Sequence, residues 1–228
     1  QGAMSFTFTD DESTTGISYG ALTGVSETLG TTMVNYEEST QAGDYLFAAR
    51  ADIEGMADAH KLIFRSEPGK FSIFNWPQNY VGIDEVPTAL LGVQNRLYAW
   101  SDKAMYVIDP FNLIVEDRIP GKGVSSRDAV MNFNNTVVFA NKTGVYTFQG
   151  QVVELSSAIK NEYTDIVKNI GNAFKIRLAH NPKHDSIMLF FDNLGTASLD
   201  KVPTDVFVYT MKNKRWDRWR LPSKVKSV

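Results

Sequence analysis

Short apolar runs recur along the chain from residue 44 onward and are separated by residues typical of turns. The first three runs are residues 45–49, 61–65 and 71–74. Pro68 and Gly69 lie between the second and the third, where proline presets φ and glycine allows a positive φ. The shortness of the runs and their flanking turn residues predict β-strands.

One hairpin pattern occurs twice, forty residues apart. The copies are residues 95–100 with 104–108, and residues 135–140 with 145–148. Tyr146 takes the place of Tyr106, and a looser third copy consists of residues 186–191 with 205–210. Short antiparallel strands at this period are typical of β-propeller blades. We therefore predict a mainly β fold of antiparallel hairpin repeats, as a β-propeller-like chain, a partial propeller or a sandwich of related hairpins.

A single amphipathic helix is predicted near residues 157–170. Ser156 or Ser157 can accept hydrogen bonds from amides of the first helical turn, and Gly171 can end the helix. The apolar positions that fall on one face are Ile159, Tyr163, Ile166, Val167 and Ile170. We expect this helix to plug or flank the sheet.

The composition narrows the class of protein. The chain has 228 residues, 43% of them hydrophobic and 21% charged, which is typical of globular domains. No apolar run approaches the roughly 18 residues of a membrane-spanning helix, so we expect no membrane span. The absence of cysteine excludes disulfides and thiolate chemistry.

We expect three segments with different roles. Residues 1–4 are typical of an expression-tag remnant and are set aside. Residues 5–43 are rich in Thr, Ser, Gly and acids, which favours an acidic extended arm or loops. Residues 44–228 form the predicted β-repeat domain.

The charge is distributed unevenly, although the formal net charge is only −3. Ten acids lie between Asp10 and Asp58 against the single base Arg50. Near the end of the chain only Asp217 opposes a group of bases: Lys212, Lys214, Arg215, Arg218, Arg220, Lys224 and Lys226. Such a segment fits a nucleic-acid patch, a complementary subunit contact or a strand edge with charges that block aggregation.

The candidate interaction residues lie in this basic segment and are Arg215, Trp216, Arg218, Trp219 and Arg220. Aromatic rings interleaved with bases are typical of single-strand nucleic-acid platforms. The same alternation describes a strand, in which Trp216 and Trp219 share a face only if a bulge intervenes.

Catalytic and metal-binding patterns are weak. Pro182 separates His180 from His184 and favours a turn over a metal-binding helix. Carboxylates such as Glu85 and Asp109 lie in or beside predicted turns, where local hydrogen bonding explains them. We therefore assign no catalytic residue, metal or cofactor, and predict that the protein is not an enzyme. The candidate ligand-binding aromatics are Trp76, Tyr80 and Trp100.

The order of these landmarks resembles a family of bacteriophage virion proteins. These are β-propeller-like components of the head-to-tail connector, the tail hub or the device that stabilises packaged DNA. The resemblance covers about two thirds of the chain. Its landmarks are residues 62–71, 95–98, 105–108, 123–130 and 135–148, then Gly150, Ile159, Val208, Tyr209, Arg215 and Trp216.

This resemblance implies a structural or assembly role through protein–protein contacts in a virion made in the host cytoplasm. The implied partners are portal, tail or fibre subunits and further copies in a ring-forming homo-oligomer, with DNA as an additional candidate. Alternative functions are a host-surface or carbohydrate-binding module of a tail fibre and a glycoside hydrolase, which needs two converging carboxylates.

Overall fold

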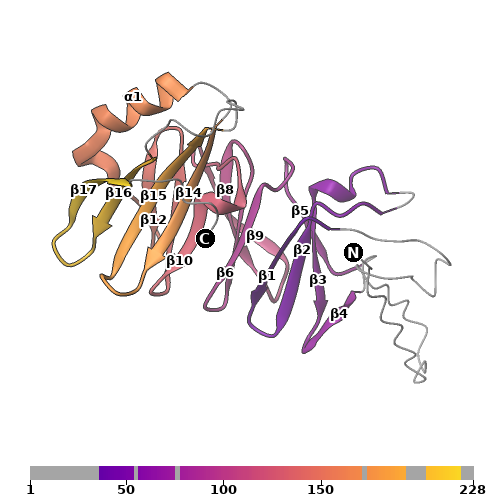
Figure 1. The fold of residues 1–228 in the computed structure, drawn as a ribbon. Coiled ribbons are helices and arrows are strands. Elements are labelled where there is room, and N and C mark those ends of the chain that lie inside the picture. The colour runs from indigo at the N-terminus through magenta and orange to yellow at the C-terminus, as the bar shows by residue number, and fades with distance from the viewer. Residues whose placement is uncertain (1–35, 54–55, 75–77, 171–173, 194–203, 222–228) are drawn as a thin grey trace, which may run out of the picture. The chain divides into compact units, whose positions relative to one another are not determined.

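The fold is mainly β, as the sequence predicts. The computed structural model describes residues 36–53, 56–74, 78–170, 174–193 and 204–221. This part of the chain holds four antiparallel sheets and one α-helix (Figure 1). The chain divides into two compact units, Gln1–Gly121 and Lys122–Val228, and each unit contains two of the sheets.

The first sheet has five strands. They are β1 (Glu38–Ala42), β2 (Tyr45–Ala49), β3 (Leu62–Glu67), β4 (Lys70–Phe74) and β5 (Tyr80–Gly82). Strands β1 to β4 follow one another across the sheet, and β5 also pairs with β3. A short 3-10 helix, η1 (Ala59–Lys61), precedes β3. The three runs predicted to be strands form β2, β3 and β4.

Strand β1 corrects the predicted boundary of the extended arm. Residues 38–42 were expected to belong to the arm, but they pair with β2 over five residues. The polar sequence of β1 hid this strand, since Ser39, Thr40 and Gln41 give no apolar alternation. Residues 1–35, which include the tag remnant and the rest of the expected arm, lie outside the described residues.

The second sheet is a four-stranded meander. Its strands are β6 (Ala89–Val93), β7 (Arg96–Trp100), β8 (Ala104–Asp109) and β9 (Ile114–Pro120). Apolar residues from its inner face and from the first sheet form one core, which includes Phe47, Ile63, Leu90, Leu97, Tyr106 and Ile108. Gly92 permits the close approach of β6 to β1, because any Cβ there would overlap the carbonyl oxygen of Gln41.

Arg65 joins the two sheets of the first unit at their surface. Its Nη1 atom donates to the carbonyl oxygens of Pro110, at 3.0 Å, and Phe111 in the turn after β8. Its guanidinium carbon lies 4.6 Å from the centroid of the Tyr45 ring. Hydrogen bonds to carbonyls and a cation–π contact therefore fix the turn between β8 and β9 against the first sheet.

The third sheet is a second meander, followed by the helix. The strands are β10 (Val130–Phe133), β11 (Thr136–Asn141), β12 (Gly144–Phe148) and β13 (Val152–Glu154). A 3-10 helix, η2 (Arg127–Ala129), precedes them, and η3 (Ser156–Ile159) leads directly into α1 (Lys160–Ile170). The predicted helix is thus confirmed, while Gly171 lies outside the described residues.

The fourth sheet holds β14 (Phe174–Asn181), β15 (Ser186–Asn193), β16 (Thr204–Thr210) and β17 (Arg215–Leu221). All three predicted hairpins are confirmed by their pairing: β7 with β8, β11 with β12, and β15 with β16. In the described part of the chain, no helix is long and apolar enough to cross a membrane.

Candidate functional site

The middle of the predicted basic segment forms β17, at one edge of the fourth sheet, while Lys212 and Lys214 lie in the preceding turn and Lys224 and Lys226 lie outside the described residues. Seven consecutive residues of β17 pair with β16, from Arg215 opposite Thr210 to Leu221 opposite Thr204, without a shift in register. Among the described residues, no strand pairs with the other edge of β17. The backbone along this edge is therefore available to a partner strand.

The two tryptophans of β17 point to opposite faces of the sheet. Trp216 lies opposite Tyr209 and Trp219 lies opposite Val206, so the two are three positions apart in a regular strand, where side chains alternate between the faces. The predicted difference in face is thus confirmed. Trp216 can therefore bind β17 to the rest of its own chain while Trp219, on the other face, contacts a partner.

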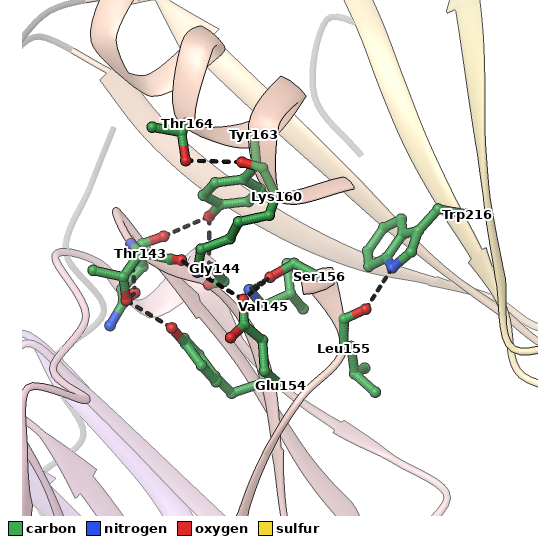
Figure 2. A network of polar contacts seen from close by, with 12 residues as sticks. Thr143, Gly144, Val145, Glu154, Leu155, Ser156, Lys160, Tyr163, Thr164 and Trp216 are labelled. Atoms are coloured by element: carbon green, nitrogen blue, oxygen red, sulfur yellow. Dashed lines mark hydrogen bonds and ion pairs between the residues drawn. The ribbon is translucent and has the colours of Figure 1, made fainter. Parts of the chain in front are cut away.

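Trp216 is an anchor. Its Nε1 atom donates a hydrogen bond of 2.8 Å to the carbonyl oxygen of Leu155, directly before η3 (Figure 2). Its ring centroid lies 5.0 Å from that of Tyr209. This half-buried indole is already bound to its own chain, which leaves less of the ring free to stack on a partner.

A partly buried polar network supports the segment that holds Trp216. The amide of Val145 donates to Ser156 Oγ at 3.0 Å, and this hydroxyl donates to Glu154 Oε1 at 3.0 Å. Lys160 Nζ lies 2.7 Å from the same carboxylate oxygen and donates to the carbonyl of Thr143 (Figure 2). The hydrogen bond from Lys160, followed by that from Ser156, lowers the pKa of Glu154.

This network corrects the predicted helix cap. Ser156 is fully buried, and its hydroxyl satisfies the backbone amide of Val145. The residue at the N-cap position of η3 is Leu155, and no side chain caps the helix there. Neither Ser156 nor Ser157 has the predicted capping role, because the short strand β13 leaves the amide of Val145 to be satisfied across the sheet.

Tyr163 fixes α1 to both sheets of the second unit. Its buried hydroxyl donates to the carbonyl of Asn141, and the carbonyl of Gly144 lies 3.4 Å away. Its ring centroid lies 5.3 Å from that of Phe191 in β15. Burial raises the pKa of Tyr163 far above its usual range, so the hydroxyl keeps its proton. Tyr163 therefore joins α1 to β11, β12 and β15.

One face of β17 presents charge and an aromatic ring. Arg215 Nη2 lies 2.8 Å from Asp217 Oδ1, and Arg215 Nε donates to Asp217 Oδ2 at 3.2 Å. Trp219, on the same face, is 41% exposed. Arg218 lies on the opposite face, exposed, with its guanidinium carbon 5.8 Å from the Phe207 ring centroid. Arg220 pairs with Asp205 through the strand register, and its side chain lies outside the described residues.

The candidate ligand-binding aromatics do not form a described cluster. Trp100 is fully buried, so its expected role as an exposed ligand platform is wrong. Tyr80 is 40% exposed and its ring centroid lies 6.2 Å from that of Phe64. Trp76 lies outside the described residues.

The histidine pair lies at the predicted turn. His180 ends β14 with Asn181, and His184 belongs to the turn that precedes β15. The ring of His180 packs against Phe133 with centroids 4.6 Å apart, and its Nε2 atom lies 3.9 Å from Asp185 Oδ1. Within the described ranges, no three His, Cys, Asp or Glu side chains gather closely enough to hold a metal ion.

The carboxyl groups with resolved pKa shifts are all lowered within the described part of the chain: Asp58, Glu85, Asp109 and Glu154. For Glu85 the largest cause is the hydrogen bond from Ser101, and for Asp109 it is the hydrogen bond from Asn112. A general acid of a glycoside hydrolase needs a raised pKa. These four groups therefore give the hydrolase alternative no support.

Sequence reasoning missed the residues that hold β17 in place. The hydrogen-bond acceptor for Trp216 is a backbone carbonyl, which has no sequence signal. The polar cluster of Glu154, Ser156 and Lys160 could not be recognised from the sequence, because it forms only where the fold brings β12 beside these residues.

Comparisons with known proteins leave the family open. No family model matches the chain, and no curated protein matches it. Among solved structures, it is similar to the crystal structure of Kluyvelomyces marxianus Hsv2, with 11% identity and a TM-score of 0.45. That match covers 81% of this chain and 48% of the other, so the chain spans about half of that structure's length. The mainly β class rests on the strands themselves.

Proposed function

We propose that this protein is a structural or assembly protein of a bacteriophage virion, at the head-to-tail connector, the tail hub or the tail. It is made in the host cytoplasm and works through contacts with portal, tail or fibre subunits and with further copies in a ring. The order of landmarks along the sequence supports the virion assignment. The shape and chemistry of β17 support a function in assembly.

The observation that carries the proposal is the difference between β17 and the last strands of the second and third sheets. Strand β13 has only three residues, and β9 pairs with β8 through a register shift between Val107 and Ile108 and ends at Pro120. Short length, irregular pairing and proline all discourage the addition of a strand. Strand β17 has seven residues in continuous register and no proline.

The residues on β17 fit a protein interface. Tryptophan and arginine are enriched among the residues that dominate binding energy. Trp219 offers an exposed ring on a strand that Trp216 fixes, so little ordering is required on binding. As part of this proposal the protein is not an enzyme, and β17 is its working surface.

Charge reversal along β17 tests the proposal. The triple variant Arg215→Glu, Arg218→Glu and Arg220→Glu should reduce incorporation into particles by about tenfold or more, because it reverses the charge that a complementary subunit meets. Raising the salt concentration should weaken assembly of the unaltered protein, because exposed charges are screened. Particle composition is measured by quantitative mass spectrometry after phage production with each variant as the only source of this protein.

A matched control carries the same change of net charge elsewhere in the second unit: Lys142→Glu, Lys168→Glu and Lys183→Glu, all at exposed positions. It should assemble normally. Equal incorporation of both triple variants would reject β17 as the assembly surface, and absence of the unaltered protein from purified particles would reject the virion assignment.

A carbohydrate-binding module is the second candidate, and the exposure of Tyr80 is the observation that favours it. The burial of Trp100 removes one of the three rings expected to contact a sugar. Binding of the unaltered protein to a host glycan array, lost in Tyr80→Ala, would favour this function. If the unaltered protein binds no glycan, the carbohydrate-binding function is rejected and the assembly function remains.

A further inference from the structure

We propose that residues 5–13 of a second copy add to the outer edge of β17 as an antiparallel strand. This inference rests on the proposed function and names the partner of the same surface. The acceptor is the unpaired edge described above. The donor is the acidic segment near the start of the chain.

The acceptor edge offers a continuous set of backbone groups. In a strand paired on one side, alternate residues direct their N–H and C=O groups away from the existing partner. The regular pairing of β17 with β16 keeps this alternation intact over seven residues. An added strand gains affinity from these main-chain hydrogen bonds and specificity from the side chains beside them.

The donor segment has the composition of a strand with complementary charge. Its sequence is Ser-Phe-Thr-Phe-Thr-Asp-Asp-Glu-Ser, in which aromatic and β-branched residues alternate without proline or glycine. Asp10, Asp11 and Glu12 make it acidic and no base opposes them, whereas the bases of β17 outnumber its one acid. Opposite charges on facing strands are favourable.

One antiparallel register satisfies both strands. With Asp11 opposite Arg215, Thr9 lies opposite Asp217 and Phe8 lies opposite Arg218. This pairs opposite charges, places a hydroxyl beside the aspartate and an aromatic ring beside a guanidinium. In this register none of the three acids of the donor lies directly opposite Asp217.

The chain is long enough to reach a neighbouring copy. Residues 14–35 separate the donor from the first described residue, and a fully extended chain of that length spans roughly 70 Å. A donor and an acceptor at different places on the same chain make a head-to-tail contact, which closes into a ring when the rotation between copies allows it. A ring therefore needs no second kind of contact.

Disulfide trapping tests the strand addition in the full-length chain. The protein contains no cysteine, so an introduced pair reports a single proximity. Two single variants, Thr9→Cys and Asp217→Cys, are mixed and oxidised gently. Because the two thiols are on different chains, a disulfide between positions 9 and 217 is intermolecular. We expect a covalent dimer, identified by mass spectrometry, at about tenfold or more above control because strand pairing raises the local thiol concentration.

The matched control mixes Thr9→Cys with Val153→Cys, which places a thiol on the short outer strand β13 at a position that is 47% exposed. Equal trapping in both mixtures, or none in either, overturns the proposal. Trapping in a chain that carries both Thr9→Cys and Asp217→Cys, without trapping in the mixture, overturns it in favour of pairing within one chain.

A charge exchange provides a second readout. Asp11→Arg should reduce trapping by about tenfold, and Arg215→Asp in the partner should restore it because the opposite charges face each other again. Failure of trapping together with loss of virion incorporation in the triple β17 variant would reject residues 5–13 as the partner and leave the proposed function standing. Successful trapping in a protein absent from particles would reject the virion assignment alone.

Discussion

In the two clear copies of the hairpin, different groups pair with the start of the second strand, which is β8 in one copy and β12 in the other. In the second sheet, β9 runs for seven residues and reaches Pro120, which lies opposite Ala104 at the start of β8. In the third sheet, β13 stops at Glu154, which lies opposite Tyr146. The start of β12 is then met by Ser156 and by the amide of Leu155, which donates to the carbonyl of Val145 at 2.8 Å.

The turns of the two hairpins also use different side chains at equivalent positions. Ser101 Oγ accepts from the amide of Ala104 at 3.0 Å, whereas Asn141 Oδ1 accepts from the amide of Thr143 at 2.9 Å. Both turns hold their backbone amides with a side-chain oxygen. In both copies a side-chain oxygen accepts a hydrogen bond from a backbone amide of the turn, although the residue that supplies this oxygen differs between the copies.

The largest expected effect on stability is at Gly144, whose counterpart in the first copy of the hairpin is Ala104. A Cβ at Gly144 would overlap Ser156 Oγ and lie 3.1 Å from Glu154 Oε1. We expect Gly144→Ala to lower the free energy of unfolding by about 3 kcal/mol, because it overpacks the site and displaces the hydroxyl from the amide of Val145. Urea unfolding measures the change.

The control is Ala104→Gly, which should cost about 1 kcal/mol or less through backbone entropy. Combining Gly144→Ala with Ser156→Ala should cost less than the sum of the single changes, since the overlapping oxygen is removed. Strict additivity would contradict the steric explanation.

The next largest effect compares the two buried serines. Ser101→Ala and Ser156→Ala should each cost about 2 kcal/mol near pH 7, because each leaves a buried backbone amide, that of Ala104 or of Val145, without this acceptor. Their dependence on pH should differ. The hydrogen bond from Ser101 is the largest cause of the lowered pKa of Glu85, whereas Lys160 is the largest cause at Glu154.

A carboxyl whose pKa is lowered by folding stabilises the fold above its unfolded pKa, and this contribution is lost as the pH falls through the folded pKa. Ser101→Ala raises the folded pKa of Glu85 toward the unfolded value, so part of its cost should disappear between about pH 5 and pH 3. Ser156→Ala should keep more of its cost over the same range. Identical pH profiles would contradict the assignment of the two causes.

A smaller effect on stability is expected in α1, which follows the second copy of the hairpin. Tyr163→Phe removes a buried hydroxyl and leaves the ring against Phe191. We expect a loss of about 1 kcal/mol, since the Asn141 carbonyl loses one hydrogen bond. Chemical unfolding followed by tryptophan fluorescence measures the change. A loss as large as that of Tyr163→Ala would show that the hydroxyl, and not the ring, holds the helix.

The smallest effect concerns the cation over the conserved ring position of the repeat. Lys122 Nζ lies 3.6 Å from the centroid of the Tyr146 ring, as Arg118 lies near Tyr106 in the first copy. Lys122→Met should lower stability by about 0.5 kcal/mol, which is the cation–π contribution at a partly exposed site. Lys142→Met, at an exposed turn position, should leave the unfolding midpoint unchanged.

The hairpins were predictable because their signals are local. Alternation and turn residues sufficed for β7 with β8 and for β11 with β12. The alternation in residues 212–220 allowed a strand there, with its tryptophans on opposite faces, and the structure places β17 at residues 215–221. Strand β1 was not predictable, because its polar residues become a strand only through pairing with β2.

The remaining errors arose from contacts between residues distant in sequence. Trp100 was a reasonable candidate for an exposed ring until the fold buried it. Ser156 had a local signal for a helix cap, but its actual partner, the amide of Val145, lies eleven residues earlier in a neighbouring strand. The carbonyl that binds Trp216 belongs to Leu155, sixty-one residues away.

The order of strand pairing has a consequence for synthesis of the chain. In the described sheets, every pair except β3 with β5 joins strands that are consecutive in sequence. Each sheet can therefore pair as soon as its own residues have left the ribosome, and translation at about 5–20 residues per second delivers a sheet every few seconds. The sheet of residues 89–120 is complete in sequence long before β17 is translated. Strand β17 is thus translated after every other described strand, and the earlier sheets have time to form before its outer edge exists.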